Sequence, residues 1–328
     1  MRDRLEAATR TLLRSFRSQR PLRGGSLLVT IIGDAIAPRG GAITLGSLIR
    51  LAAPFGLTER LVRTSVARLA HDDWLVARRN GRLSEYRLSA HGRRRFTEAT
   101  RRIYGENPRD WSGRWTLVLL APKVNGRARE RLREELDWLG FGEPSPGVFA
   151  HPTRTPADTR GQLASLSAVA HATVLEAQNG DPEADRRFAA AGWDLGELAK
   201  RYRRFVRLFE PIRSALVAGD EPDPRTAFVI RTLLIHEYRK IHLRDPLLPA
   251  QLLPRDWIGA EAYELCREAY ARVFAPAETH LAAMAERIDA PLPPPSAETL
   301  RRFGGISLPS SAGDSPVPAG SGSRGDRP

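Results

Sequence analysis

The chain has 328 residues, 41% hydrophobic and 27% charged, which provides enough apolar material for packed cores and excludes a wholly disordered chain. At roughly 100–200 residues per domain, this length predicts two or three domains. No stretch approaches the roughly 20 apolar residues of a membrane-spanning helix, and the basic N-terminus lacks the apolar segment of a secretory signal. Because Cys266 is the only cysteine, we expect no internal disulfide, an inert packed thiol and a protein of the reducing cytoplasm.

The net charge of +13 is confined to the first third of the chain. Residues 1–102 contain 21 arginines, no lysine and 8 acidic residues, a surplus of 13, so the remainder sums to zero. An arginine-rich composition explains the scarcity of lysine, but it does not explain this asymmetry. A basic unit joined to a neutral remainder is typical of a polyanion-binding module.

The first third of the chain is predicted to be mainly helical. Residues 1–22 have the pattern of a short basic amphipathic arm, and a buried helix over 26–37 and a second helix over 44–53 follow. After a tight turn, Thr58 is placed to cap a helix over residues 59–71, whose apolar side chains recur at helical spacing.

A hairpin is predicted directly after these helices. The strand-like runs 74–78 and 84–88 flank Asn80-Gly81, a preferred two-residue turn because both residues tolerate positive φ. Ser89 then caps a further helix that continues through Arg102. The order of helices and hairpin predicts a winged helix-turn-helix domain over residues 23–105.

The rest of the chain predicts an α+β unit and then a helical one. Short strands and helices alternate over residues 106–180, which indicates a ferredoxin-like α+β domain. Long helical patterns follow, and they define a helical C-terminal domain over 190–290. Residues 291–328 are rich in Pro, Ser and Gly, so we expect a disordered tail. The predicted fold class is therefore α+β.

Eight polar residues of the basic unit are candidates for DNA contact. On the helix over 59–71 they lie opposite the apolar face, where an α-helix fits the major groove and an arginine can pair with guanine. At the hairpin tip, arginines would reach a minor groove or the phosphate backbone. A solvated charged face is the alternative reading of any single arginine. The candidates are Arg60, Arg63, Thr64, Ser65 and Arg68 on the helix and Arg78, Arg79 and Arg82 at the hairpin.

Several strings resemble the PaaX family of phenylacetate-degradation repressors, and the resemblance covers about residues 20–290. The residues that carry it are SLLVTIIGDAIAPRG (26–40), LTERLVRT (57–64), NGRLSEYRLS (80–89) and RTLLIHEYRKIHLRDPLLPAQLLPRDW (231–257). The resemblance implies a winged helix that binds operator DNA, a Cas2-like ferredoxin fold in the middle and a helical C-terminal domain. It also implies release from DNA by phenylacetyl-CoA or a related aryl-CoA thioester. Glu85 departs from the family's wing pattern and places a negative charge toward DNA unless it turns inward.

Taken together, these features predict a cytoplasmic, homodimeric DNA-binding repressor, not an enzyme, with double-stranded operator DNA and an aryl-CoA effector as partners and no other cofactor. The phosphates of such an effector need basic residues, and the candidates are Arg201, Arg203, Arg204 and Arg207, or Arg239 and Arg244. The first cluster is more simply explained as a solvated helix face. Residues 236–246 are more simply explained as a buried polar network that orders the helix end.

Two other classes remain open at this stage. A metal-dependent nuclease of the Cas2-like type needs clustered carboxylates at the end of its first strand, and Pro122-Lys123-Val124-Asn125 offers none there. His236 and His242 are six residues apart, which places them on different sides of a helix and is wrong for a zinc site. The other enzyme of this class, a thioester-processing protein with a regulatory DNA domain, would need a nucleophile that the sequence does not reveal. An architectural DNA binder without an effector is the second alternative class.

Overall fold

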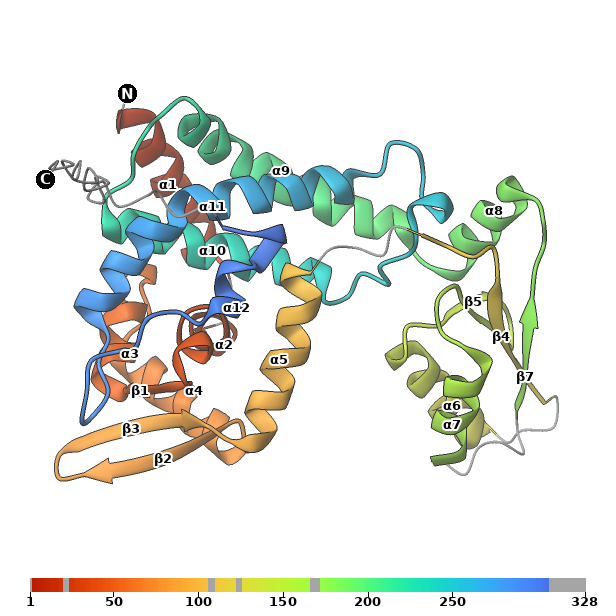
Figure 1. The fold of residues 1–328 in the computed structure, drawn as a ribbon, viewed down its shortest axis with the longest axis horizontal. Helices are drawn as coiled ribbons and strands as arrows, with labels where there is room; N and C mark the ends of the chain where they lie inside the picture. Colours follow the sequence, from red (N-terminus) through yellow and green to blue (C-terminus); the bar gives the residue numbers. More distant parts are fainter. Residues whose placement is uncertain (1, 20–23, 106–109, 122–125, 166–171, 307–328) are drawn as a thin grey trace, which may run out of the picture.

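The computed structural model describes residues 2–19, 24–105, 110–121, 126–165 and 172–306 of the chain. Figure 1 shows a large body, formed by the first and last parts of the chain, and a smaller body formed by the middle part. The fold is mixed α and β, as predicted, with two small sheets and a helical C-terminal region. None of the described helices is long and apolar enough to cross a membrane.

The chain from residue 24 to residue 104 has helices and a hairpin in the order from which the sequence predicted a winged helix-turn-helix, and these are here named the winged-helix elements. The elements are α2 (Gly24–Ile31), the π-helical turn η1 (Ile32–Ile36), η2 (Ala37–Arg39), β1 (Ala42–Thr44), α3 (Leu45–Ala52), η3 (Ala53–Phe55), α4 (Glu59–His71), β2 (Leu75–Asn80), β3 (Leu83–Leu88) and α5 (Ala90–Tyr104). Thr44 and Thr58 cap α3 and α4, because their hydroxyls accept hydrogen bonds from Ser47 and Leu61 backbone N–H groups. Gly56, at φ +81°, provides the turn between the two helices.

The hairpin differs from the prediction by one residue. Asn80 pairs with Leu83, so the two loop residues are Gly81 and Arg82, not Asn80 and Gly81. Gly81 adopts φ +56°, and a two-residue loop that begins with a glycine at positive φ matches the twist of the paired strands. The sequence did not predict β1, which pairs antiparallel with β3 and gives the sheet order β1-β3-β2.

The middle of the chain folds as the ferredoxin-like unit that the sequence predicts. Its elements are β4 (Trp115–Leu120), α6 (Gly126–Trp138), β5 (Gly142–Ser145), β6 (Val148–His151), α7 (Pro156–Ser165) and β7 (Ala172–Ala177), in the antiparallel sheet order β5-β6-β4-β7. A further helix, α8 (Pro182–Gly192), was not predicted. It contributes to a second small core, where Trp115 packs near Ala189 and donates its indole N–H to Asp185 at 2.8 Å.

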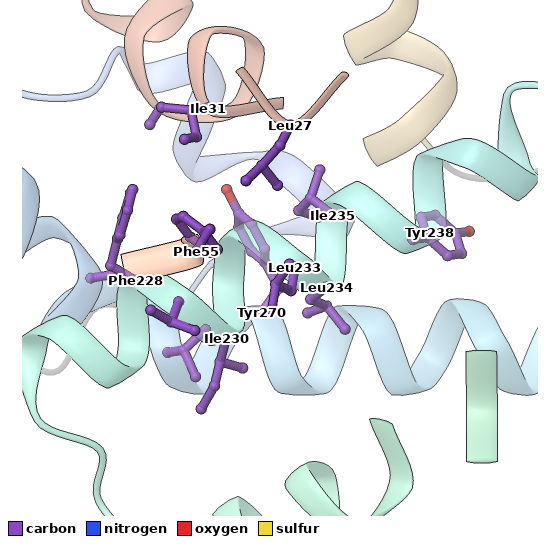
Figure 2. Close-up of a cluster of buried hydrophobic side chains, with 14 of the residues drawn as sticks. Leu27, Ile31, Phe55, Phe228, Ile230, Leu233, Leu234, Ile235, Tyr238 and Tyr270 are labelled. Atoms are coloured by element: carbon purple, nitrogen blue, oxygen red, sulfur yellow. The ribbon is translucent and has the colours of Figure 1, made fainter. Parts of the chain in front are cut away.

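Long helices complete the large body. They are α9 (Leu195–Val217), α10 (Pro224–His242) and α11 (Ile258–Met284), with the short η5 (Ala250–Leu252) between the last two. Helix α10 is buried on nearly all sides. In Figure 2 it presents Phe228 and Ile235 toward Leu27 and Ile31 of α2, while α11 runs beneath it. The predicted units 23–105 and 190–290 therefore share one continuous hydrophobic core.

The N-terminal segment is part of the same core. Helix α1 (Arg2–Arg17) contacts α9 and α10, and Leu5, Leu12 and Phe16 are buried there. Phe16 meets Phe55 and His236 edge to face. Over its described residues, the predicted basic arm is thus a docked helix with a charged outer side.

The expectation of a disordered tail from residue 291 is wrong for residues 291–306. Residues 285–306, here named the C-terminal strap, run back over the winged-helix elements and contain α12 (Ala297–Leu300) and η6 (Arg302–Gly304). Two backbone hydrogen bonds hold the strap: the Thr44 N–H donates to the Glu286 carbonyl, and the Ser296 N–H donates to the Pro38 carbonyl. Two buried side chains of the strap, Arg302 and Phe303, also hold it against the large body. Residues 307–328 lie outside the described residues.

Candidate nucleic-acid interface

Helix α4 presents the arginine face that the sequence predicts. Val62 and Val66 are fully buried, and they anchor the helix to the core. Arg60, Arg63 and Arg68 lie on the opposite, exposed side. The same 3.6-residue period that buries the valines therefore directs the arginines into solvent.

Three polar side chains on this face, those of Arg63, Thr64 and Arg68, have partners within the helix or directly after it. Arg63 donates to Glu59 at 2.8 and 2.6 Å, and Arg68 lies 3.8 Å from Asp72. The Thr64 hydroxyl donates to the Arg60 carbonyl at 2.9 Å. Exposed ion pairs of this type contribute only about 0–1 kcal/mol, so the arginines can exchange these carboxylates for phosphate or base acceptors at little cost.

One candidate on α4 faces elsewhere. Ser65 is half-buried against α2, where a Cβ on Gly25 would lie 3.6 Å from its hydroxyl oxygen. The neighbouring Gly24 leaves no room for a side chain, because its Cβ would lie 2.8 Å from Leu61. The structure thus separates Ser65 from the exposed arginines and gives it a place in the contact between α2 and α4.

The hairpin carries the other three candidates. Arg78, Arg79 and Arg82 are all exposed. Arg78 donates to Asp289 of the strap at 2.9 Å, and its side chain remains 47% exposed. Arg79 and Arg82 have no side-chain partner among the residues that the structure describes, so the hairpin tip presents two uncompensated charges.

Glu85 turns inward. Its side chain is 1% exposed, and it accepts hydrogen bonds from Arg87 Nε at 2.5 Å and from the Ile288 backbone N–H at 2.9 Å. Burial opposes the ionisation of this carboxyl, but the Ile288 and Arg87 hydrogen bonds hold its pKa below the usual value. The acidic residue in the wing therefore fixes the strap and does not face a duplex.

A buried charged cluster lies behind the interface, and the sequence analysis did not identify it. Asp34, in η1, accepts hydrogen bonds from Tyr104, Tyr270, Arg231 and Arg302 at 2.6–2.8 Å. Burial opposes ionisation of Asp34, but the two guanidinium groups hold its pKa below the usual value. The cluster joins α10, α11 and the strap to η1 and α5 of the winged-helix elements.

The polar string 236–246 does not form a single network. His236 contacts the Thr30 hydroxyl at 3.0 Å, and Arg239 donates to the same hydroxyl at 2.7 Å. On the other side of α10, Asp245 accepts from Tyr202 at 2.7 Å. Arg244 is exposed. The string is divided between two clusters because successive helical residues point in different directions.

Within the described ranges, no three or more His, Cys, Asp or Glu side chains come together to form a metal site. Residues 122–125, where the sequence predicted no carboxylate cluster, lie outside those ranges. Cys266 is fully buried, as expected, and burial raises the pKa of its thiol.

The fold and the surface define a multidomain α+β protein in which an arginine-lined helix and hairpin are joined to a ferredoxin-like unit and a helical bundle. Three family models match the chain: PaaX-like protein over residues 23–92, PaaX protein central Cas2-like domain over 108–189 and PaaX-like protein C-terminal domain over 193–283. The chain is also 37% identical over 294 residues to the transcriptional repressor PaaX of Escherichia coli (strain K12), covering 88% of this chain and 92% of that protein.

The chain belongs to the PaaX family of transcriptional repressors. The relative named above is a transcriptional repressor, so the chain is assigned to non-enzymatic regulators and not to the Cas2-like nucleases. A solved structure, that of the uncharacterized protein Rv0674 from Mycobacterium tuberculosis, matches with 24% identity and a TM-score of 0.49, covering 72% of this chain and 91% of the other.

Proposed function

We propose that the protein is a homodimeric repressor that binds operator DNA of an aromatic-acid catabolic operon of the phenylacetate type. An aryl-CoA thioester such as phenylacetyl-CoA releases it. The observation that carries the DNA-binding part is the exposed arginine face of α4, with Val62 and Val66 buried behind it. The effector part rests on the resemblance to PaaX proteins, at 37% identity over nearly the whole chain.

In this proposal α4 enters the major groove, with Arg60, Arg63 and Arg68 toward base edges and phosphates. The hairpin tip, with Arg79 and Arg82, contacts the neighbouring backbone or minor groove. Two copies of the chain engage half-sites about one helical turn apart, or a multiple of it.

A mobility-shift assay tests the proposal. The full chain is incubated with a duplex from its own upstream region, alone and with phenylacetyl-CoA, other acyl-CoA thioesters, CoA or phenylacetate. We expect a specific shift that aryl-CoA thioesters reverse. Absence of specific binding overturns the repressor proposal. Specific binding that no thioester alters favours the effector-independent architectural alternative.

A further inference from the structure

A groove of about 640 Å³ lies between α1, α9 and α10, on a part of the molecule that the candidate nucleic-acid interface does not use. This volume lies in the range of small-molecule sites, about 300–1,000 Å³. Figure 1 shows α1 and α9 at the opposite end of the large body from the β2–β3 hairpin. A ligand in the groove therefore leaves the arginines of α4 and the hairpin uncovered.

The lining of the groove has an excess of positive charge, although residues 103–328 sum to zero. Glu237 is the acidic residue of its lining, against five cationic ones: Arg201 and Arg204 on α9, Arg239 and Lys240 on α10, and Arg244 just after α10. Arg201 and Lys240 pair with Glu197 and Glu237. Arg204 and Arg244 are exposed and have no side-chain partner within the described residues.

The rest of the lining is largely apolar. Leu12 and Phe16 of α1, Phe205 and Leu208 of α9 and Leu233 and Ile241 of α10 contribute to it. A simple carboxylate needs about one arginine, whereas several phosphates need several cations. Cations beside an apolar floor thus suit a ligand with both a multiply charged part and an apolar part.

We propose that this groove is the effector site and that it holds the acyl-CoA through its phosphates on Arg204, Arg244 and the neighbouring cations, with the acyl group on the apolar floor. This inference rests on the proposed function and goes further by placing the ligand in the chain.

Arg239 connects the groove to the DNA-contacting helix. Its Nη2 donates to the carbonyl and the hydroxyl of Ser26, at 2.6 and 2.8 Å, and its Nε donates to Thr30 at 2.7 Å. Both partners are on α2, which packs directly on α4 at Gly24 and Leu61. A phosphate that draws Arg239 into the groove weakens its hold on α2, and the altered packing of α2 reaches α4. A ligand shifts the equilibrium only by this difference in affinity between the two arrangements.

Titration calorimetry with phenylacetyl-CoA tests the site on the full chain. The double variant Arg204→Glu/Arg244→Glu is expected to raise the Kd by about 30-fold or more, because it places like charge against the phosphates. The matched control is Arg203→Glu. The sequence offered Arg203 as a phosphate contact, but the structure leaves it exposed on the same helix and outside the lining of the groove, so the Kd is expected to stay within about twofold because solvent screens its charge. Melting temperatures of the free proteins exclude misfolding of the variants as the cause.

The outcomes separate the two proposals. If the unaltered chain binds no aryl-CoA thioester, the proposed effector is overturned. If it binds phenylacetyl-CoA and the double variant binds equally well, the groove is overturned while the proposed function stands. Equal affinity for CoA and phenylacetyl-CoA overturns the role of the apolar floor, because each buried CH₂ is expected to strengthen binding several-fold.

A second variant tests the connection to α2. Thr30 is buried, binds Arg239 and does not line the groove. Thr30→Val is expected to keep phenylacetyl-CoA binding within about threefold of the unaltered chain, since it leaves the groove's charges in place. It should also change the thioester concentration at which operator DNA is released. Release at an unchanged concentration would overturn the route through Arg239 and α2.

Discussion

At the scale of single residues, Asp34 holds the large body together. Its four donors are 70, 197, 236 and 268 residues away along the chain. No local pattern predicts such partners, because helical and strand periods report only on neighbours within a turn or a pleat. The outward direction of the α4 arginines could be predicted, because it follows from the spacing of the buried valines within the same helix.

Asp34→Asn tests this cluster. The substitution removes the carboxylate that the buried Arg231 and Arg302 share. Arg231 still pairs with Glu278, but Arg302 keeps no carboxylate partner within the described residues, and breaking a buried ion pair in this way costs about 3–5 kcal/mol. The free energy of unfolding in urea measures the loss. Asp289→Asn is the control, because its exposed pair with Arg78 contributes less than about 1 kcal/mol. Equal, small losses in both variants would contradict the role of Asp34.

Because of His151, we expect the stability of the middle unit to decrease as the pH is lowered. Its Nδ1 accepts backbone N–H groups of Thr153 and Arg154, at 3.1 and 3.0 Å, which requires the neutral ring. Burial and the nearby Arg154 charge lower the pKa of His151 from 6.5 to about 3. Below pH 6.5 the unfolded state therefore binds the proton and the folded state does not. The free energy of unfolding is highest above pH 6.5 and decreases as the pH falls toward 3.

By linkage, the middle unit loses about 2 kcal/mol of stability between pH 7 and pH 5. His151→Asn keeps an acceptor but removes the titration, so the variant should be less sensitive to pH over that interval. Urea unfolding monitored by near-ultraviolet circular dichroism, at pH 7 and pH 5, compares the two proteins. Identical pH slopes would contradict the assignment.

At the scale of elements, the sequence predicted the long amphipathic helices and most strands of the two sheets, with ends displaced by a few residues, but it predicted neither β1 nor β5. Helix α4 begins and ends at the predicted residues, 59 and 71. The three-residue strand β1 was missed because it forms only against β3. Helix α8 was missed because its buried side is defined by Trp115 and the loop around Leu252, which are remote in sequence.

A substitution of Arg63 tests the proposed contact between α4 and operator DNA. Arg63→Ala is expected to cost about 1–3 kcal/mol of operator affinity and to relax specificity at one base pair if the residue reads a base. Fluorescence anisotropy against operator duplexes with single base changes measures both effects. A loss that is uniform across sequences identifies a phosphate contact. Arg207→Ala, on α9, is the control and should leave affinity unchanged.

For the hairpin, we predict a weaker dependence of DNA affinity on salt concentration. The double variant Arg79→Ala/Arg82→Ala removes two phosphate contacts and should reduce the slope of log affinity against log salt by about 2. Affinities measured from low to moderate ionic strength provide the slope. An unchanged slope would show that the hairpin tip does not contact the DNA backbone.

At the scale of the whole molecule, the winged-helix elements and the helical bundle are one body. Leu27 and Ile31 of α2 are buried against α10, and Phe55 lies edge to face with Phe228 at 6.0 Å between ring centres. The sequence divides them into separate domains because composition and charge change between them, although the cores are continuous. Charge asymmetry reports on the surface, whereas the boundary of a folded body is set by its buried side chains.

A fragment of residues 1–105 is therefore not expected to fold cooperatively on its own. Without α10 and α11 it exposes the apolar faces of α1 and α2, whose burial contributes roughly 25 cal/mol per Å². Amide dispersion in NMR spectra and the cooperativity of thermal unfolding distinguish the outcomes. A cooperative transition in the fragment would contradict the shared core.

The C-terminal strap has a consequence for the gene. A premature stop codon at any position between Met284 and Phe303 leaves the three family-matched segments at full length, and yet it deletes the Arg302 guanidinium on which Asp34 depends. Such a lesion truncates only the end of the reading frame but is expected to inactivate the product as a missense change in the core would.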